Sequence, residues 1–234
     1  MSISQNLAAV RERINGAAVR AGRLPEEIAL MAVSKTQTPE RIREAYNAGQ
    51  RLFGENRVQE FSGKSEALRD LKNPEWHMIG HLQTNKAAKT AELFHAVDSV
   101  DSLKLAEKLD ASARALGRKL DVLIEINVGG ETAKSGVAPD SAALGELLMA
   151  APRLEALVFH GLMTVPPFTD DPEAARPYFR KLRELGDTIA ARKLSGVTMD
   201  QLSMGMSHDF EVAIEEGSTC VRVGTAIFGK RSKA

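Results

Sequence analysis

Lys35 is unusual because it comes at the end of a run of apolar residues. Lys35 follows the run 28–33 and precedes Thr38-Pro39, which is a typical helix start. We therefore expect it in the short turn between a strand and a helix, where functional groups are common. A lysine amine that is partly shielded from water can condense with an aldehyde, and a solvated loop lysine is the simpler alternative.

A second group of residues, near the C-terminus, could bind an anion. Ser207 follows Met206 at the expected start of a helix, where free backbone N–H groups favour a phosphate. Arg222, Gly224 and Thr225 add a guanidinium, an open approach to the backbone and a hydroxyl. Each residue alone fits a structural role as a helix cap, a relief of crowding or half of an ion pair. Together they make a phosphate site as good an explanation as those roles.

An imine-forming lysine that faces a phosphate site suits two chemistries. One is the binding of pyridoxal 5′-phosphate (PLP), and the other is an aldolase reaction on a phosphorylated sugar. Spacing alone does not choose between them.

Other motifs point to structure rather than chemistry. His77 and His81 are four residues apart, but on a strand this spacing does not present two metal ligands, so we expect no metal site. Gly129-Gly130 matches no phosphate-binding glycine motif and indicates a turn. Cys220, the single cysteine, lies in an apolar run and is expected to be a buried structural thiol.

Predicted strands and helices alternate along the chain, and they must position both Lys35 and the possible anion site at Ser207, Arg222, Gly224 and Thr225. An amphipathic helix is expected over about residues 4–22, because Leu7, Val10, Ile14 and Ala18 recur at helical spacing. Eight apolar or β-branched runs then predict strands, separated by segments with helix caps: 28–34, 51–54, 76–79, 94–97, 122–128, 157–163, 201–204 and 220–228.

Eight strands alternating with helices predict a single (β/α)8 barrel spanning residues 1–234, with a doubly wound open sheet as the alternative. No helix is expected after the last strand, and the N-terminal helix is expected to cover that gap. In such a barrel the active site forms at the carboxyl ends of the strands. Lys35, Asn56 and the Ser207–Thr225 corner all fall there.

Composition excludes several classes of function. Thirty-one basic and 31 acidic side chains cancel, so no overall field attracts nucleic acid or an anionic membrane. No apolar run approaches the roughly 20 residues needed to span a bilayer. The N-terminus lacks the pattern of a signal peptide, and one cysteine suits a reducing compartment, so a cytoplasmic protein is expected.

The chain resembles the pyridoxal-phosphate homeostasis protein family. The motifs that carry the resemblance cover nearly the whole chain in order: AVSKT (32–36), LFGENRVQE (52–60), WHMIGHLQTNKA (76–87), VDSVDS (97–102), INVGGETAKSG (126–136), GLMTV (161–165) and LSMGMSHDFEVAIEEGSTCVRVGTAIFG (202–229). The resemblance implies a barrel of PLP fold type III, like the N-terminal domain of alanine racemase.

The resemblance also implies roles for particular residues. Lys35 matches the lysine that holds PLP as a Schiff base, and Asn56 matches a residue beside the cofactor ring. Met206, Ser207, Gly224 and Thr225 match the phosphate-binding segments. Arg222 matches an arginine near the cofactor, on the phosphate or on the pyridine nitrogen.

The function that the resemblance implies is PLP homeostasis, in which the protein buffers or delivers the cofactor without catalysis. We expect no second domain after Gly229 to enclose the cofactor, which favours binding over reaction. A PLP-dependent amino-acid racemase of narrow specificity is the alternative. The expected partners are PLP and, transiently, apo PLP-dependent enzymes, and the protein is expected to be a monomer with no catalytic residues, no nucleic-acid partner and no membrane partner.

Overall fold

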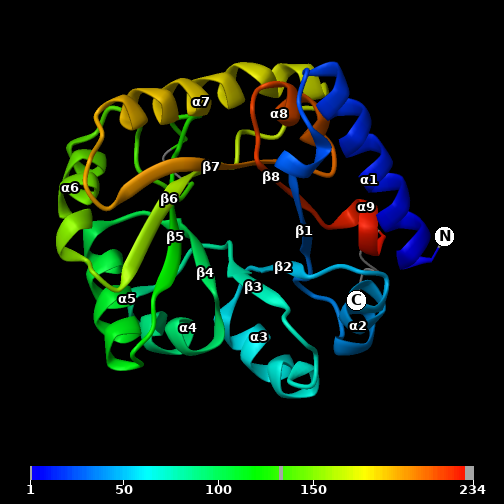
Figure 1. The fold of residues 1–234 in the computed structure, drawn as a ribbon, viewed down its shortest axis with the longest axis horizontal. Helices are drawn as coiled ribbons and strands as arrows, with labels where there is room; N and C mark the ends of the chain where they lie inside the picture. The colour runs from blue at the N-terminus through cyan, green and yellow to red at the C-terminus, as the bar shows by residue number, and fades with distance from the viewer. Residues whose placement is uncertain (1, 132–133, 230–234) are drawn as a thin grey trace.

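Eight parallel strands close into a barrel in which each strand is hydrogen-bonded to the next in chain order and β8 is bonded to β1 (Figure 1). The computed structural model describes residues 2–131 and 134–229. The predicted barrel is therefore confirmed, and the open sheet is excluded. The strands are β1 (Ala29–Val33), β2 (Leu52–Glu55), β3 (Glu75–Met78), β4 (Ala96–Val100), β5 (Leu120–Glu125), β6 (Leu157–Met163), β7 (Val197–Met206) and β8 (Cys220–Val223).

Helices surround the strands as an outer ring (Figure 1). The α-helices are α1 (Ile3–Arg20), α2 (Pro39–Asn47), α3 (Val58–Ser65), α4 (Ala87–Leu93), α5 (Leu103–Ala115), α6 (Ala142–Ala150), α7 (Arg176–Ala191), α8 (Phe210–Glu215) and α9 (Thr225–Phe228). Short 3-10 turns complete the connections: η1 (Pro25–Glu27), η2 (Glu66–Leu68), η3 (Thr84–Lys86), η4 (Ala151–Arg153) and η5 (Pro172–Ala175). None of the helices in the described ranges combines the length and apolarity needed to cross a bilayer.

The end of β8 differs from the prediction. The strand was expected to continue to Phe228 with no helix after it, but it stops at Val223 and α9 follows at once. The amides of Ile227 and Phe228 donate to the carbonyl of Gly224 at 3.0 and 2.9 Å, which closes a helical turn. An apolar helical turn and an apolar strand have the same composition over four residues, so periodicity could not separate them. Residues 230–234, which follow the predicted strand, lie outside the described residues.

The N-terminal helix covers the end of the barrel wall, as predicted. α1 packs against α8 and α9, with Leu7, Val10 and Ile14 on its buried face. A capping box between Ser2 and Gln5 starts the helix. The Asn6 side chain donates to the carbonyl of Ile227 at 2.8 Å, so α1 also fixes the position of α9.

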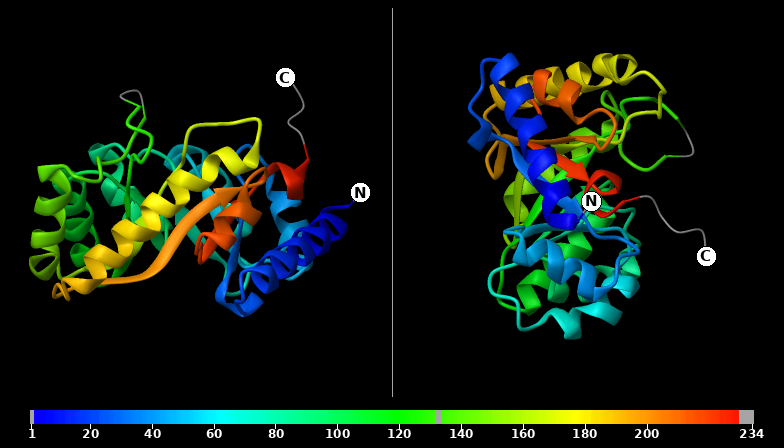
Figure 2. Two further views of the ribbon diagram at one scale, coloured as in Figure 1. Left: turned by 90° about the horizontal axis from the view of Figure 1, so that it is seen from above. Right: turned by 90° about the vertical axis from the view of Figure 1, so that its right-hand side faces the viewer.

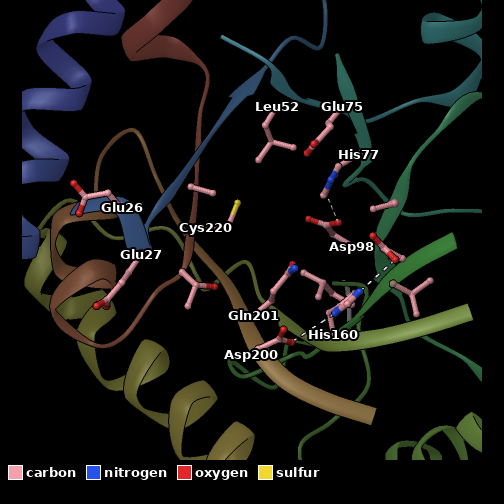
Figure 3. Close-up of a pocket in the computed structure, with 16 residues that line it drawn as sticks. Glu26, Glu27, Leu52, Glu75, His77, Asp98, His160, Asp200, Gln201 and Cys220 are labelled. Carbon is pink, nitrogen blue, oxygen red and sulfur yellow. Dashed lines mark hydrogen bonds and ion pairs between the residues drawn. The ribbon is translucent and has the colours of Figure 1, made fainter. Parts of the chain in front are cut away.

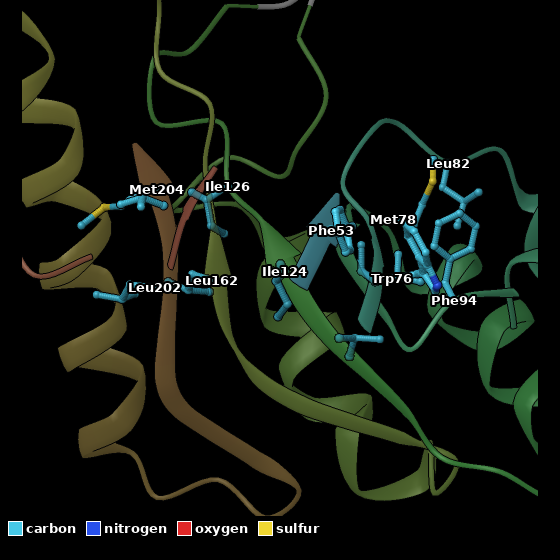
Figure 4. Packing of buried hydrophobic residues seen from close by; sticks show 14 of the residues in the cluster. Phe53, Trp76, Met78, Leu82, Phe94, Ile124, Ile126, Leu162, Leu202 and Met204 are labelled. Atoms are coloured by element: carbon cyan, nitrogen blue, oxygen red, sulfur yellow. The ribbon is translucent and has the colours of Figure 1, made fainter. Parts of the chain in front are cut away.

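The main hydrophobic core lies between the barrel wall and the helices rather than inside the barrel (Figure 4). Trp76 stacks on Phe53 with ring centroids 4.9 Å apart, and Phe61 packs on Trp76 at 4.6 Å. Contacts of this size between aromatic rings bury large apolar areas. Buried polar side chains also lie on the strands near their carboxyl ends, among them Glu55, Glu125 and Arg222.

The carboxyl ends of the strands define one mouth of the barrel. Figure 2 shows the loop after β5 and helix α9 on the same side of the molecule. All strands are parallel, so the residues that follow them meet at this mouth.

Candidate functional site

Lys35 lies at the carboxyl-terminal mouth, in the turn after β1, and is half buried. The next residue, Thr36, has φ 64°, a left-handed conformation that costs energy for a β-branched side chain. Its amide donates to Glu60 Oε1 at 2.6 Å, which holds the turn in this conformation. The sequence prediction of a strand-to-helix turn is confirmed.

A buried ion-pair network lies behind the Lys35 turn, and the sequence did not reveal it. Lys64 Nζ, from α3, lies 2.8 Å from Glu55 Oε1 and donates to the carbonyl of Ser34 at 3.0 Å. Ser34 Oγ donates to the same Glu55 oxygen at 2.6 Å. Burial raises the pKa of Glu55, although the adjacent Lys64 opposes that effect. Lys64 Nζ also donates to Glu60 Oε1 at 3.0 Å, so the network is bonded to Ser34 before Lys35 and to Thr36 after it. It thereby fixes the direction of the Lys35 backbone.

Asn56 follows β2, the strand next to β1, and is half buried at the same mouth. Gly80, after β3, packs directly on its backbone, because a Cβ at Gly80 would lie 2.9 Å from Asn56 Cα and still closer to its carbonyl oxygen. Only glycine fits this approach. Gly80 therefore sets the depth at which Asn56 enters the mouth.

Ser207 does not cap α8, contrary to expectation. The residue before α8 is Asp209, whose Oδ1 accepts from the amide of Met206 at 2.6 Å. Ser207 Oγ instead accepts from the amides of Gly224 and Ala226, at 3.3 and 3.4 Å. The hydroxyl thus joins the β7–α8 loop to the start of α9.

Gly224 and Thr225 complete this corner. Gly224 lies against β1, because a Cβ there would be 3.3 Å from the carbonyl oxygen of Val33. Thr225 is exposed and begins α9. The structure therefore brings Ser207, Gly224 and Thr225 together beside β1, the strand that leads to Lys35.

Arg222 lies inside the barrel and is 4% exposed. Its guanidinium donates to Ser203 Oγ and to the carbonyl of Thr164, both at 2.7 Å. The structural alternative for Arg222 was an ion pair with a carboxylate, and no such pair is found among the described residues. Burial lowers the pKa of Arg222, while the carboxylates of Asp98, Glu125 and Asp209 act in the opposite direction. Arg222 is in register with Met31 of β1 and Met206 of β7. Its guanidinium therefore supplies positive charge below the corner formed by Ser207, Gly224 and Thr225.

Glu125, at the end of β5, is a further polar residue of the interior that sequence reasoning missed. It is 8% exposed, and its Oε2 has no hydrogen-bond partner among the described residues. Burial and the charge of Asp101 raise the pKa of Glu125 to about 7. The available signal was one acidic residue inside the apolar run Val122–Val128.

The loop after β5 carries Lys134, which is half buried. Its amine pairs with Glu131 and donates to the carbonyl of Pro166 at 3.2 Å. Asn127 holds the base of the loop through a bond from Nδ2 to the carbonyl of Glu131 at 2.8 Å. Residues 132 and 133 of the INVGGETAKSG motif lie outside the described residues.

The opposite mouth holds a cavity of about 430 Å³ (Figure 3). Its lining includes the pair of His77 Nδ1 and Asp98 Oδ1, which are 2.9 Å apart. Cys220 also lines it and is buried, as predicted, and burial raises the pKa of its thiol to about 12. No group of three metal-ligating side chains occurs in the described part of the chain. Lys35 and the Ser207 corner do not line this cavity.

The chain matches known proteins over its whole length. The alanine racemase N-terminal domain family matches residues 5–232. A protein of Aquifex aeolicus named pyridoxal phosphate homeostasis protein is 49% identical over 232 residues, which are 99% of each chain. A protein of the same name from Escherichia coli K12 is 45% identical over 231 residues, covering 98% of this chain and 97% of the relative.

A solved relative has the same fold. The structure of PipY from Synechococcus elongatus PCC7942 with PLP bound superposes with a TM-score of 0.84 at 37% identity. The match covers 97% of this chain and all of PipY.

Proposed function

This chain belongs to the alanine racemase N-terminal domain family and, within it, to the pyridoxal phosphate homeostasis proteins, and we propose on that basis that it binds PLP and takes part in PLP homeostasis. The observation that carries the proposal is the position of Lys35. This half-buried residue follows β1 at the mouth where β1 lies against Gly224 and the Ser207 corner.

The chemistry of the donor set fits PLP. The amides of Gly224 and Ala226 converge on one oxygen, Ser207 Oγ, in the way that amides bind a phosphate oxygen. Thr225 adds an exposed hydroxyl, and Arg222 adds a buried positive charge. These residues would hold the phosphate and ring, and Lys35 would hold the aldehyde carbon.

When bound, PLP supplies an aldehyde that condenses with an amine and a ring that can accept electrons. The chain's own residues bind and orient it. The Lys64 network fixes the turn from which the Lys35 amine extends, and Gly80 fixes Asn56 beside it. Ser207 keeps α9 in register with the β7–α8 loop.

The proposal assigns a carrier role rather than an enzymatic one, in the cytoplasm and as a monomer. The name shared by the relatives supports a homeostatic role. The family match to alanine racemase keeps a racemase as the second candidate. Steady loss of optical rotation from an L-amino acid, abolished in Lys35→Ala, would favour the racemase. Transfer of bound PLP to an apo-enzyme, faster than its spontaneous release, would support delivery.

Thermal unfolding tests the binding itself. A ligand that binds only the folded protein stabilises it, by about 2.7 kcal/mol at 100 times its Kd. We expect PLP to raise the Tm of the wild type and of Lys86→Ala, a lysine on the 3-10 turn after β3. Lys35→Ala should respond far less. An equal rise in Lys35→Ala would contradict the role assigned to Lys35, and no rise in any protein would contradict PLP binding.

A further inference from the structure

Glu125 combines three properties that no other residue of β5 combines. It is acidic, it is more than nine-tenths buried, and its Oε2 has no hydrogen-bond partner in the described ranges. A buried carboxylate oxygen without a partner is costly, so such groups are uncommon in folded proteins. A bound ligand that contacts the oxygen removes this cost.

The pleat of β5 turns Glu125 toward the barrel interior. Side chains alternate along a strand, and Ile124 belongs to the outer hydrophobic core between wall and helices. Val122 belongs to that core too, whereas Leu123 is 3% exposed and does not, which places Leu123 and Asp121 on the inward side of the strand. Glu125 continues this inward series, at the end of the strand nearest the carboxyl-terminal mouth.

The ring of strands places Glu125 across from Lys35. In the closed order β1 to β8, β5 is four strands away from β1 in either direction. Both residues lie at the carboxyl ends of their strands. A molecule anchored at Lys35 and at the neighbouring Ser207 corner therefore extends toward the side of the mouth that Glu125 occupies.

The charges that act on Glu125 come from several elements. Asp101, after β4, disfavours its ionised form, whereas Arg222 of β8 and His81, after β3, favour it. His81 Nδ1 in turn lies 3.2 Å from Asp101 Oδ2. On β6, the residue in register with Glu125 is Met163, which does not titrate. Burial remains the main cause of the raised pKa of Glu125, which lies at about 7.

We propose that Glu125 is a ligand-contacting residue of the cofactor site and that it takes up a proton when PLP binds. The inference rests on the proposed binding of PLP at this mouth. PLP brings negative charge into the mouth, and such a charge favours the neutral form of a buried carboxyl that faces the same mouth. The proton comes from the solvent and adds to the carboxylate, whose O–H then donates to an acceptor on the ligand.

A consequence is that PLP retention depends on pH. Binding coupled to proton uptake weakens as pH rises, because the free protein has then lost the proton that the complex holds. The site therefore keeps its cofactor more firmly on the acid side of neutrality and releases it more easily on the alkaline side.

The test is titration calorimetry of PLP into the wild type and Glu125→Gln at about pH 8, in two buffers that lack primary amines and differ in ionisation enthalpy. The difference in heat between buffers counts the protons taken up per PLP. We expect the number of protons taken up per PLP to be larger in the wild type than in Glu125→Gln, by at least roughly half a proton. Glu146→Gln, which removes an exposed carboxylate from α6, should match the wild type.

Each outcome separates this inference from the proposed function. Equal proton uptake in wild type and Glu125→Gln, with PLP bound by both, overturns the role of Glu125 and leaves PLP binding intact. No binding by any of the three proteins overturns the proposed function. If Glu125→Gln does not fold, infrared difference spectra of the wild type decide. A carboxylic-acid carbonyl band must then appear on PLP addition, and its absence overturns the inference.

Discussion

Single residues at the carboxyl-terminal mouth determine what the site can bind. Lys35 could be singled out from sequence because a charge that ends an apolar run is visible without a structure. Glu125 is also visible as one acidic residue, here inside an apolar run, but nothing local shows whether such a residue points inward or outward. Its orientation depends on the pairing of β5 with both neighbours, which is a property of the closed barrel.

The raised pKa of Glu125 predicts a dependence of stability on pH in the cofactor-free protein. Its ordinary value is 4.5 and its value in the folded protein is about 7. Between these values the folded protein holds a proton that the unfolded chain has lost, so stability falls as pH rises through this window. Glu125→Gln removes the cost of burying an ionised carboxylate. We therefore expect Glu125→Gln to be more stable than the wild type at pH 8 by up to about 3 kcal/mol.

Urea unfolding at a series of pH values measures this difference. The gap between Glu125→Gln and the wild type should shrink toward pH 4, where both side chains are neutral. A gap that stays constant with pH, or a Glu125→Gln protein less stable than the wild type at pH 8, would contradict burial of an ionised Glu125.

At the scale of elements, the Lys64 network joins α3 to the turn after β1. Lys64 is buried against the fully buried Glu55, and removal of one partner of a buried pair leaves the other charge uncompensated. We expect Lys64→Met to lower the free energy of unfolding by roughly 3–5 kcal/mol and to weaken PLP binding. In Lys64→Met/Glu55→Gln much of the stability should return.

A surface ion pair serves as the comparison. Lys89 pairs with Glu92 on α4, and both are about half exposed, so Lys89→Met should cost less than about 1 kcal/mol. The role of the network would be disproved by a Lys64→Met protein that unfolds like Lys89→Met in urea.

The close packing of Gly80 on Asn56 gives a second prediction at this scale. Gly80→Ala forces the β2 and β3 ends apart, and overpacking of this kind typically costs about 1–3 kcal/mol. A Cβ at Gly63, inside α3, would meet no neighbour within 4 Å among the described residues, so Gly63→Ala should be neutral or stabilising. Thermal unfolding and PLP titration of both proteins check this, and equal behaviour would contradict the packing argument.

The order of the elements was predictable from sequence, because hydrophobic runs and caps alternate along most of the chain. Residues 157–163 form β6 as predicted, and Thr38 precedes α2 as predicted. The predictions that differ from the structure concern the end of β8 and the role of Ser207. Ala226–Phe228 is as apolar as a strand, yet it turns helical after Gly224, and Ser207 bonds to that turn rather than to α8. Both outcomes depend on contacts distant in the sequence.

At the scale of the molecule, α1 links the start of the chain to its last two helices. Its buried face packs on α8 and α9, and Asn6 holds α9 directly. Leu7→Ala should therefore cost about 2–5 kcal/mol and weaken PLP binding through the displaced corner. Val19→Ala, on the exposed side of α1, should cost little. A Leu7→Ala protein that loses stability but keeps full PLP affinity would contradict the link from α1 to the corner.

PLP binding at the carboxyl-terminal mouth through Lys35 underlies the roles proposed for the other residues of the site. The visible absorbance spectrum of the purified protein after incubation with PLP tests it most directly. We predict a band of covalently held PLP that persists after gel filtration in the wild type and is absent in Lys35→Ala. An identical band in Lys35→Ala, or a colourless wild type, would contradict the claim.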